Sequence, residues 1–113
     1  MAQILDKKEI EQFINDIGID DFKILLDAFF SECSDKLADL DRNSLEADHD
    51  LLELNSHTLK SLSRTFGALK LGEACAKLEH ASKNKDHENY RLLIENIKRA
   101  SHYALEALRK EYS

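Results

Sequence analysis

The sequence contains no proline, no valine and only two threonines, and this restricts the backbone structures open to it. Valine and threonine are β-branched residues that favour strands, so a sheet protein of this composition would depend almost wholly on isoleucine and aromatic residues. Leucine, alanine, glutamate and lysine are abundant instead, and these residues lose little conformational entropy in a helix. The composition therefore predicts an all-α protein.

Apolar residues recur at steps of three and four, which indicates helices with one buried face. Asp6 is a candidate N-cap with Glu9 three residues later, and glycines at 18 and 67 are typical of helix ends. The final helix follows a polar break and takes Asp86 as its predicted N-cap, with either Tyr103 or Ala104 on its apolar face. The predicted helices run from Asp6 to Gly18, from Asp20 to Arg42–Leu45, from Asp48 to Phe66, from Leu69 to Ser82, and from Asp86 onward.

Four long helices joined by short breaks close most simply as an antiparallel, up-and-down four-helix bundle. The short first helix is expected to cap one end of this bundle. A length of 113 residues provides one modest core, so residues 1–113 are expected to form a single domain.

Charge and hydropathy exclude several partners. The chain has 16 basic and 22 acidic side chains and a formal net charge of -6, which disfavours binding to nucleic acid. No apolar run approaches the roughly 20 residues of a membrane span, and the N-terminus lacks the apolar stretch of a signal peptide. We therefore expect a cytoplasmic protein, with Cys33 and Cys75 as buried free thiols.

The helix predicted from Asp48 to Phe66 places a histidine on its polar side. At about 100° per residue, four polar side chains fall within roughly 60° of His57: Glu53, Lys60, Ser61 and Arg64. The opposite side is predicted to hold Leu51, Leu52, Leu59, Leu62 and Phe66.

An exposed imidazole beside two cations suits an anionic ligand. A neutral imidazole is a nucleophile for phosphorus, and the charges of Lys60 and Arg64 could bind the oxygens of a transferred group. A solvated basic strip without function is the other interpretation of the same spacing.

The segment from Ser56 to Ala68, with Leu71, Cys75, Leu78 and Glu79 after it, resembles histidine-containing phosphotransfer (HPt) domains of bacterial phosphorelays. The family pattern is a small residue, His-x-x-Lys followed by glycine or serine, a Gly-Ala pair and then Cys-x-x-Leu-Glu. Ser61 departs from the commoner glycine, and the His-x-Leu-Lys-Ser form is similar to the branch of the family that serves in vibrio quorum sensing.

The resemblance implies a role for each matched residue. His57 would accept a phosphoryl group through Nε2, and Lys60 would contact the phosphoryl oxygens without being needed for the fold. Glu79 would accept a hydrogen bond from Nδ1–H of His57, and a glutamine at this position would retain that hydrogen bond. Ser61 would leave space for a partner, and Lys83 would add positive potential.

The same resemblance implies a monomeric relay protein without ATP-dependent kinase activity or a cofactor of its own. The receiver domain of a hybrid sensor kinase would donate the phosphoryl group, and the receiver domain of a response regulator would accept it. Each receiver would supply the Mg²⁺.

Three other classes of protein are alternatives to this interpretation. A sensor-kinase dimerisation domain usually has proline after its histidine, and a kinase needs a glycine-rich phosphate loop; this chain has neither. A di-metal oxidase needs two Glu-x-x-His pairs, whereas only Glu46 and His49 have that spacing, in a predicted solvated turn. A helical adaptor is the third, and it would not need His57. The other histidines, His80, His87 and His102, are predicted to lie at the surface.

Overall fold

A computed structural model describes residues 3–113, which form five α-helices and one short 3-10 helix. The chain order is α1 (Lys7–Ile17), α2 (Ile19–Leu45), α3 (His49–Thr65), α4 (Leu69–Lys83), the 3-10 helix η1 (His87–Asn89) and α5 (Tyr90–Tyr112). These bounds agree closely with the helices that the apolar spacing predicts.

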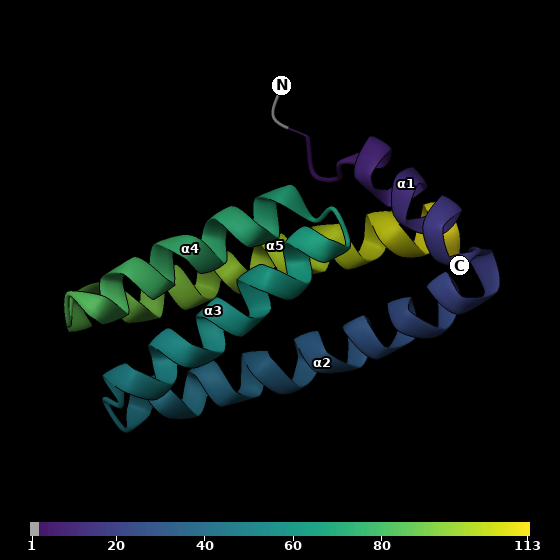
Figure 1. Cartoon of the computed structure of the whole chain (residues 1–113). Coiled ribbons are helices and arrows are strands. Elements are labelled where there is room, and N and C mark those ends of the chain that lie inside the picture. The colour runs from purple at the N-terminus through teal and green to yellow at the C-terminus, as the bar shows by residue number, and fades with distance from the viewer. Residues whose placement is uncertain (1–2) are drawn as a thin grey trace.

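The four long helices form an antiparallel bundle, and the short α1 lies across one end of it (Figure 1). In the bundle α2 packs against α3 and α5, and α4 also packs against α3 and α5, so that α3 lies diagonally opposite α5. This arrangement confirms the predicted fold class, and it exposes the outer side of α3.

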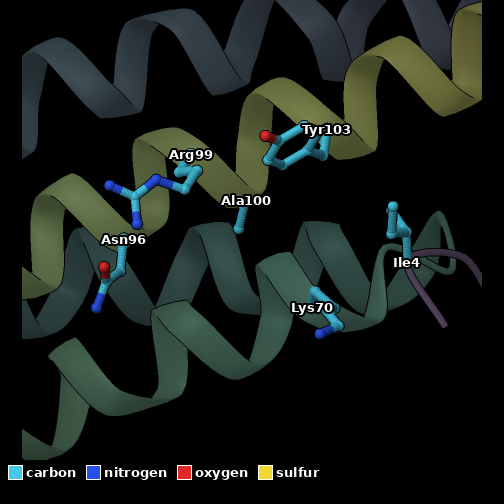
Figure 2. A pocket seen from close by; sticks show the side chains of 6 residues that line it. All are labelled: Ile4, Lys70, Asn96, Arg99, Ala100 and Tyr103. Carbon is cyan, nitrogen blue, oxygen red and sulfur yellow. The ribbon is translucent and has the colours of Figure 1, made fainter. Parts of the chain in front are cut away.

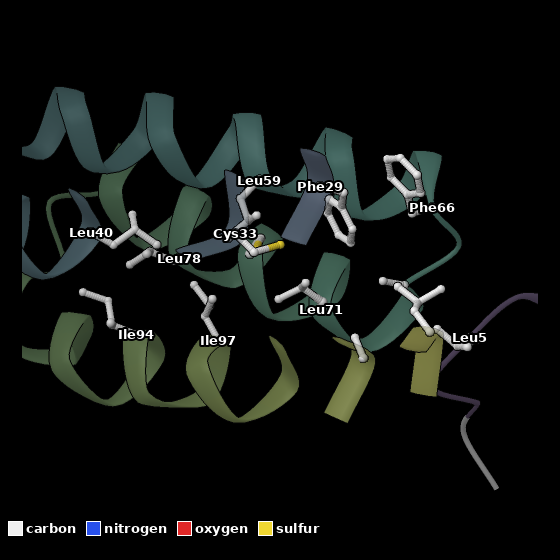
Figure 3. Close-up of a cluster of buried hydrophobic side chains, with 14 of the residues drawn as sticks. Leu5, Phe29, Cys33, Leu40, Leu59, Phe66, Leu71, Leu78, Ile94 and Ile97 are labelled. Carbon is white, nitrogen blue, oxygen red and sulfur yellow. The ribbon is translucent and has the colours of Figure 1, made fainter. Parts of the chain in front are cut away.

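Side chains from all four long helices meet along the axis of the bundle (Figure 3). Cys33 from α2, Leu59 from α3, Leu78 from α4 and Ile97 from α5 are all fully buried there. Both cysteines are buried free thiols, as predicted. The core therefore fixes which face each helix turns outward.

The turn between α3 and α4 holds α1 in place. Asp6 caps α1 by accepting a hydrogen bond from the Glu9 backbone N–H, and its own N–H donates to the Gly67 carbonyl at 2.7 Å. Leu5 forms an isolated antiparallel bridge with Ala68.

Gly67 has φ of +65°, and a Cβ there would lie 2.8 Å from a side-chain carbon of Ile10. Glycine is therefore required where α3 ends.

One detail of the final helix differs from the sequence prediction. Asp86 precedes the 3-10 helix and not α5, and its side chain caps no backbone N–H; it accepts a hydrogen bond from the Asn89 side chain at 2.7 Å. The polar break is thus one short turn longer than predicted. Of the two candidates for the apolar face, Ala104 is buried and Tyr103 is exposed.

Gly72 lies where α4 faces α3, and there is room for a side-chain carbon at this position. A Cβ added there would lie 3.6 Å from the Arg64 Cγ and 3.8 Å from the Ser63 Cβ, which are ordinary contacts.

Within residues 3–113, no helix combines the length and the apolar character needed to cross a membrane.

Candidate functional site

His57 lies near the middle of α3 on its outward face, and its side chain is 54% exposed. The buried residues of α3 include Leu52, Ser56 and Leu59, which turn the helix so that position 57 faces solvent. The Ser56 hydroxyl donates to the Leu52 carbonyl at 2.6 Å, which satisfies this buried polar group within the helix. The helix periodicity predicts the placement of His57 correctly.

Glu79 on α4 reaches the imidazole ring from the neighbouring helix. Its Oε2 lies 2.8 Å from Nδ1 of His57, while its side chain is only 9% exposed. A carboxylate accepts hydrogen bonds only, so Nδ1 is the donor and carries the proton. The neutral ring therefore keeps the Nε2 lone pair free, which is the nitrogen that a nucleophilic imidazole needs.

Lys60 lies one turn after His57, but its ammonium group does not face solvent. The Lys60 Nζ forms a charge-assisted hydrogen bond with Oε1 of Glu79, and the lysine side chain is 16% exposed. The two oxygens of Glu79 are thus divided between Lys60 and His57. The sequence does not predict this contact, and removal of Lys60 would leave a nearly buried carboxylate without its ionic partner.

The pKa of Glu79 lies below its ordinary value of 4.5. Burial of the carboxyl group raises this pKa, but the hydrogen bonds from Lys60 and His57, with the charges of the same two residues, lower it by more. Glu79 is therefore an anion at neutral pH, as acceptance of two hydrogen bonds requires.

The remaining predicted site residues lie around His57, Lys60 and Glu79. Ser61 and Arg64 are exposed on α3, one and two turns beyond His57. Lys83 on α4 is also exposed, and its Nζ lies 3.8 Å from Oε2 of Glu79. The structure thus brings Glu79 to the imidazole and brings Lys60 and Lys83 to Glu79, while Arg64 extends the basic surface along α3.

A buried asparagine pair between α2 and α3 is absent from the sequence prediction. Asn55 donates to the Oδ1 of Asn43 at 2.7 Å, and Lys36 donates to Asn55 at 3.4 Å. The helical wheel indicates burial of Asn55, since this residue lies about 160° from His57, on the apolar side. Leu51, which the wheel also predicts on that side, is 39% exposed.

His49 is not part of a solvated turn, in contrast to the prediction. It begins α3, and its Nδ1 lies 2.7 Å from the hydroxyl of the buried Tyr90. Among residues 3–113, no group of three His, Cys, Asp or Glu side chains is placed to hold a metal ion. His80, His87 and His102 are exposed, as predicted.

A pocket of about 420 Å³ lies between α4 and α5 (Figure 2). Lys70 and Arg99 are the cations at its edge, and Figure 2 shows their charged ends lying apart and not facing a common point. This pocket therefore lacks the convergent polar groups that surround His57.

The fold and this histidine site together define a class of protein. A family model described as the Hpt domain matches residues 24–111, and the chain belongs to this family of histidine-containing phosphotransfer domains.

Individual relatives agree with this class. The chain is 32% identical over 84 residues to the phosphorelay protein LuxU of Vibrio harveyi, a match that spans 73% of this chain and 72% of LuxU. The crystal structure of histidine-containing phosphotransfer protein B (HptB) from Pseudomonas aeruginosa PAO1 has the same fold, with a TM-score of 0.93. That comparison covers 99% of this chain and 96% of HptB at 23% identity. The general role of the chain is histidine phosphotransfer.

Proposed function

We propose that this protein carries a phosphoryl group between two receiver domains, with His57 as the acceptor. The observation that carries the proposal is the Nδ1 hydrogen bond to Glu79 at 2.8 Å on a ring that is otherwise exposed, because it leaves Nε2 unprotonated. The Nε2 lone pair forms the N–P bond as the P–O bond of the donor's aspartyl phosphate breaks. The reverse exchange passes the group to the aspartate of the second receiver.

The receiver domains would supply the Mg²⁺ that neutralises the phosphoryl oxygens in transfer. The upstream receiver would belong to a hybrid sensor kinase and the downstream one to a response regulator. The relationship to the phosphorelay protein LuxU supports this placement in a relay. The single domain, the monomeric state and the cytoplasmic location remain predictions from the sequence.

An apolar surface beside His57 supports docking of a folded partner. Leu54 lies one turn before His57 and is 57% exposed. Leu25, Thr58 and Leu62 line a shallow groove of about 450 Å³ between α2 and α3. Exposed apolar side chains around a reactive group are typical of a surface that excludes water when a partner binds.

The test is transfer of labelled phosphate from a phosphorylated receiver domain to the purified protein. The parent and His102→Gln, which alters another exposed histidine, should both acquire an acid-labile, base-stable label, whereas His57→Gln should acquire none. Label that persists in His57→Gln would contradict the assignment of the acceptor. A functional partner assay that is insensitive to His57→Gln would favour the helical adaptor instead.

A further inference from the structure

A second concave region follows the line where α4 meets α5. One pocket of about 420 Å³ includes Lys70 in its lining, and another of about 470 Å³ includes Lys77. Residues of α4 and α5 line both pockets, so we describe them together as the α4–α5 groove. At about 100° per residue, both lysines lie roughly 160–180° around α4 from Glu79. The groove is therefore on the side of α4 that faces away from His57.

The basic side chains of the α4–α5 groove have no acidic partner. Among the residues that the structure describes, Lys70, Lys77 and Arg99 form no ion pair. Glu73 lies between the two lysines on α4 and pairs with neither. Asp86 is the acidic residue in the lining, and its carboxylate accepts a hydrogen bond from η1. The groove therefore presents uncompensated positive charge on a chain whose net charge is -6.

The α4–α5 groove also exposes apolar and aromatic surface. Figure 2 shows Tyr103 and Ile4 at one end of the first pocket and Asn96 and Arg99 at the other. The Tyr103 side chain is 53% exposed. Tyrosine and arginine are the residue types that contribute most often to the centre of a protein interface, and these two lie about one turn apart on α5. This combination suits a protein segment better than a free anion.

The spacing of the cations indicates the form of that segment. Lys70 and Lys77 are separated by two helical turns, or roughly 10 Å along α4. One small anion cannot contact both, whereas carboxylates seven residues apart on another helix have the same separation. A groove between two packed helices accepts a third helix, which is a common mode of peptide recognition.

We propose that the α4–α5 groove is a second docking surface, which binds an acidic helix of a partner protein while His57 remains free. Carboxylates of the partner helix lie against Lys70, Lys77 and Arg99, and one of its apolar side chains packs on Tyr103. This inference goes beyond the proposed function, because the groove and the histidine are on different sides of α4. A nucleic acid fits less well, because its continuous phosphate charge extends beyond three cations onto a surface of net negative charge.

The probe for this surface is a helical peptide of about 20 residues, in which glutamate and leucine each recur every seven residues on one face. Amide nitrogen and proton shifts of the labelled protein should change most along the α4–α5 groove. A control peptide with glutamine in place of glutamate should bind more weakly by about tenfold or more. Shift changes centred on His57, or no changes at about 1 mM peptide, would overturn the proposal.

A matched pair of charge reversals tests the position of the surface. Lys77→Glu changes an exposed side chain in the groove, and Lys23→Glu makes the same change at an exposed position of α2. Lys77→Glu should weaken binding of the acidic peptide by about tenfold or more, and Lys23→Glu should bind it as the parent does. Equal losses would overturn the proposal, because they would reflect net charge alone. Circular dichroism verifies that both variants are folded.

The remaining measurements distinguish other occupants and separate the groove from the histidine. Equal binding of a single-stranded oligonucleotide would assign the groove to nucleic acid, and groove shifts that grow with the concentration of the protein alone would assign it to a second copy. Either result would overturn the proposal. His57→Gln should bind the peptide as the parent does, and saturating peptide should leave transfer from a phosphorylated receiver unchanged. Inhibition of transfer by the peptide would contradict separate surfaces, whereas failure of transfer without peptide would contradict only the proposed function.

Discussion

Glu79 is a nearly buried carboxylate whose oxygens receive donors from two positions one turn apart on α3. Its ionisation is favoured only as long as those donors outweigh the unfavourable effect of burial. A residue that holds the reactive ring is thus also a residue on which the packing of α3 and α4 depends. Stability and reactivity are therefore coupled through one side chain.

Lys60→Met should lower the stability of the protein at neutral pH by about 1–3 kcal/mol, because it leaves the buried charge of Glu79 poorly compensated. The folded-state pKa of Glu79 is depressed below 4.5, so the stabilisation is fully present above that value and is lost as pH falls through the lower folded-state pKa. Urea unfolding from about pH 7 to pH 3 should show that the difference in unfolding free energy between parent and variant, the stability gap, decreases in acid. A gap independent of pH would show that the ion pair is not its source.

At the scale of helices, α1 and the turn from α3 to α4 form one unit. Backbone hydrogen bonds from Asp6 and Leu69 cross between the N-terminal segment and this turn, and Phe29 stacks on Phe66 with centroids 4.6 Å apart. The end of α3 is therefore fixed by contacts far apart in sequence. This anchors the helix that carries His57.

Two glycine substitutions should have opposite effects. Gly67→Ala places a Cβ 2.9 Å from the Asp6 carbonyl oxygen at a φ of +65°, and it should cost at least about 1–2 kcal/mol. Gly72→Ala adds a methyl group with ordinary contacts inside α4, and it should stabilise by about 0.5–1 kcal/mol. Denaturant midpoints with unchanged slopes would measure both changes. Equal effects of the two variants would contradict the role assigned to Gly67.

The sequence predicts the helices and the exposure of His57 because both depend on local periodicity and capping. It does not predict that Lys60 turns inward to Glu79, since the direction of a long flexible side chain depends on its partner across the helix interface. The Asn43–Asn55 pair is absent from the sequence prediction, although the place of Asn55 on the apolar side of the helical wheel indicates that it is buried. The 3-10 turn before α5 follows from Asp86 bonding the Asn89 side chain, a choice that propensity alone does not determine.

Over the whole molecule, charge is distributed unevenly around the bundle. The helix α2 carries seven acidic and three basic side chains, whereas α4 and α5 together carry eight basic and five acidic ones. α3 packs between α2 and α4, so His57 lies between the strongly acidic α2 and α4, which carries three basic and two acidic side chains. A partner of complementary charge is therefore steered into one orientation over the ring.

Two exposed leucines on different helices test whether docking is confined to the side of α3. Leu54→Asp should weaken binding of a receiver domain by at least tenfold, because it puts a charge into the apolar surface beside His57. Leu92→Asp alters a leucine of similar exposure, 61% against 57%, on α5 diagonally across the bundle, and it should bind as the parent does. Calorimetric titration provides both affinities, and equal losses would place the docking surface elsewhere.

The reactivity of the two buried thiols reports opening of the core. Burial raises the pKa of Cys33 and of Cys75 to about 12, so both thiols are protonated at neutral pH while the core is closed. Alkylating reagents attack the thiolate, and they must also reach it. Cys75 lies one turn before Glu79 on α4. The rate at which a thiol reagent modifies Cys75 therefore measures how often α4 separates from the neighbouring helices.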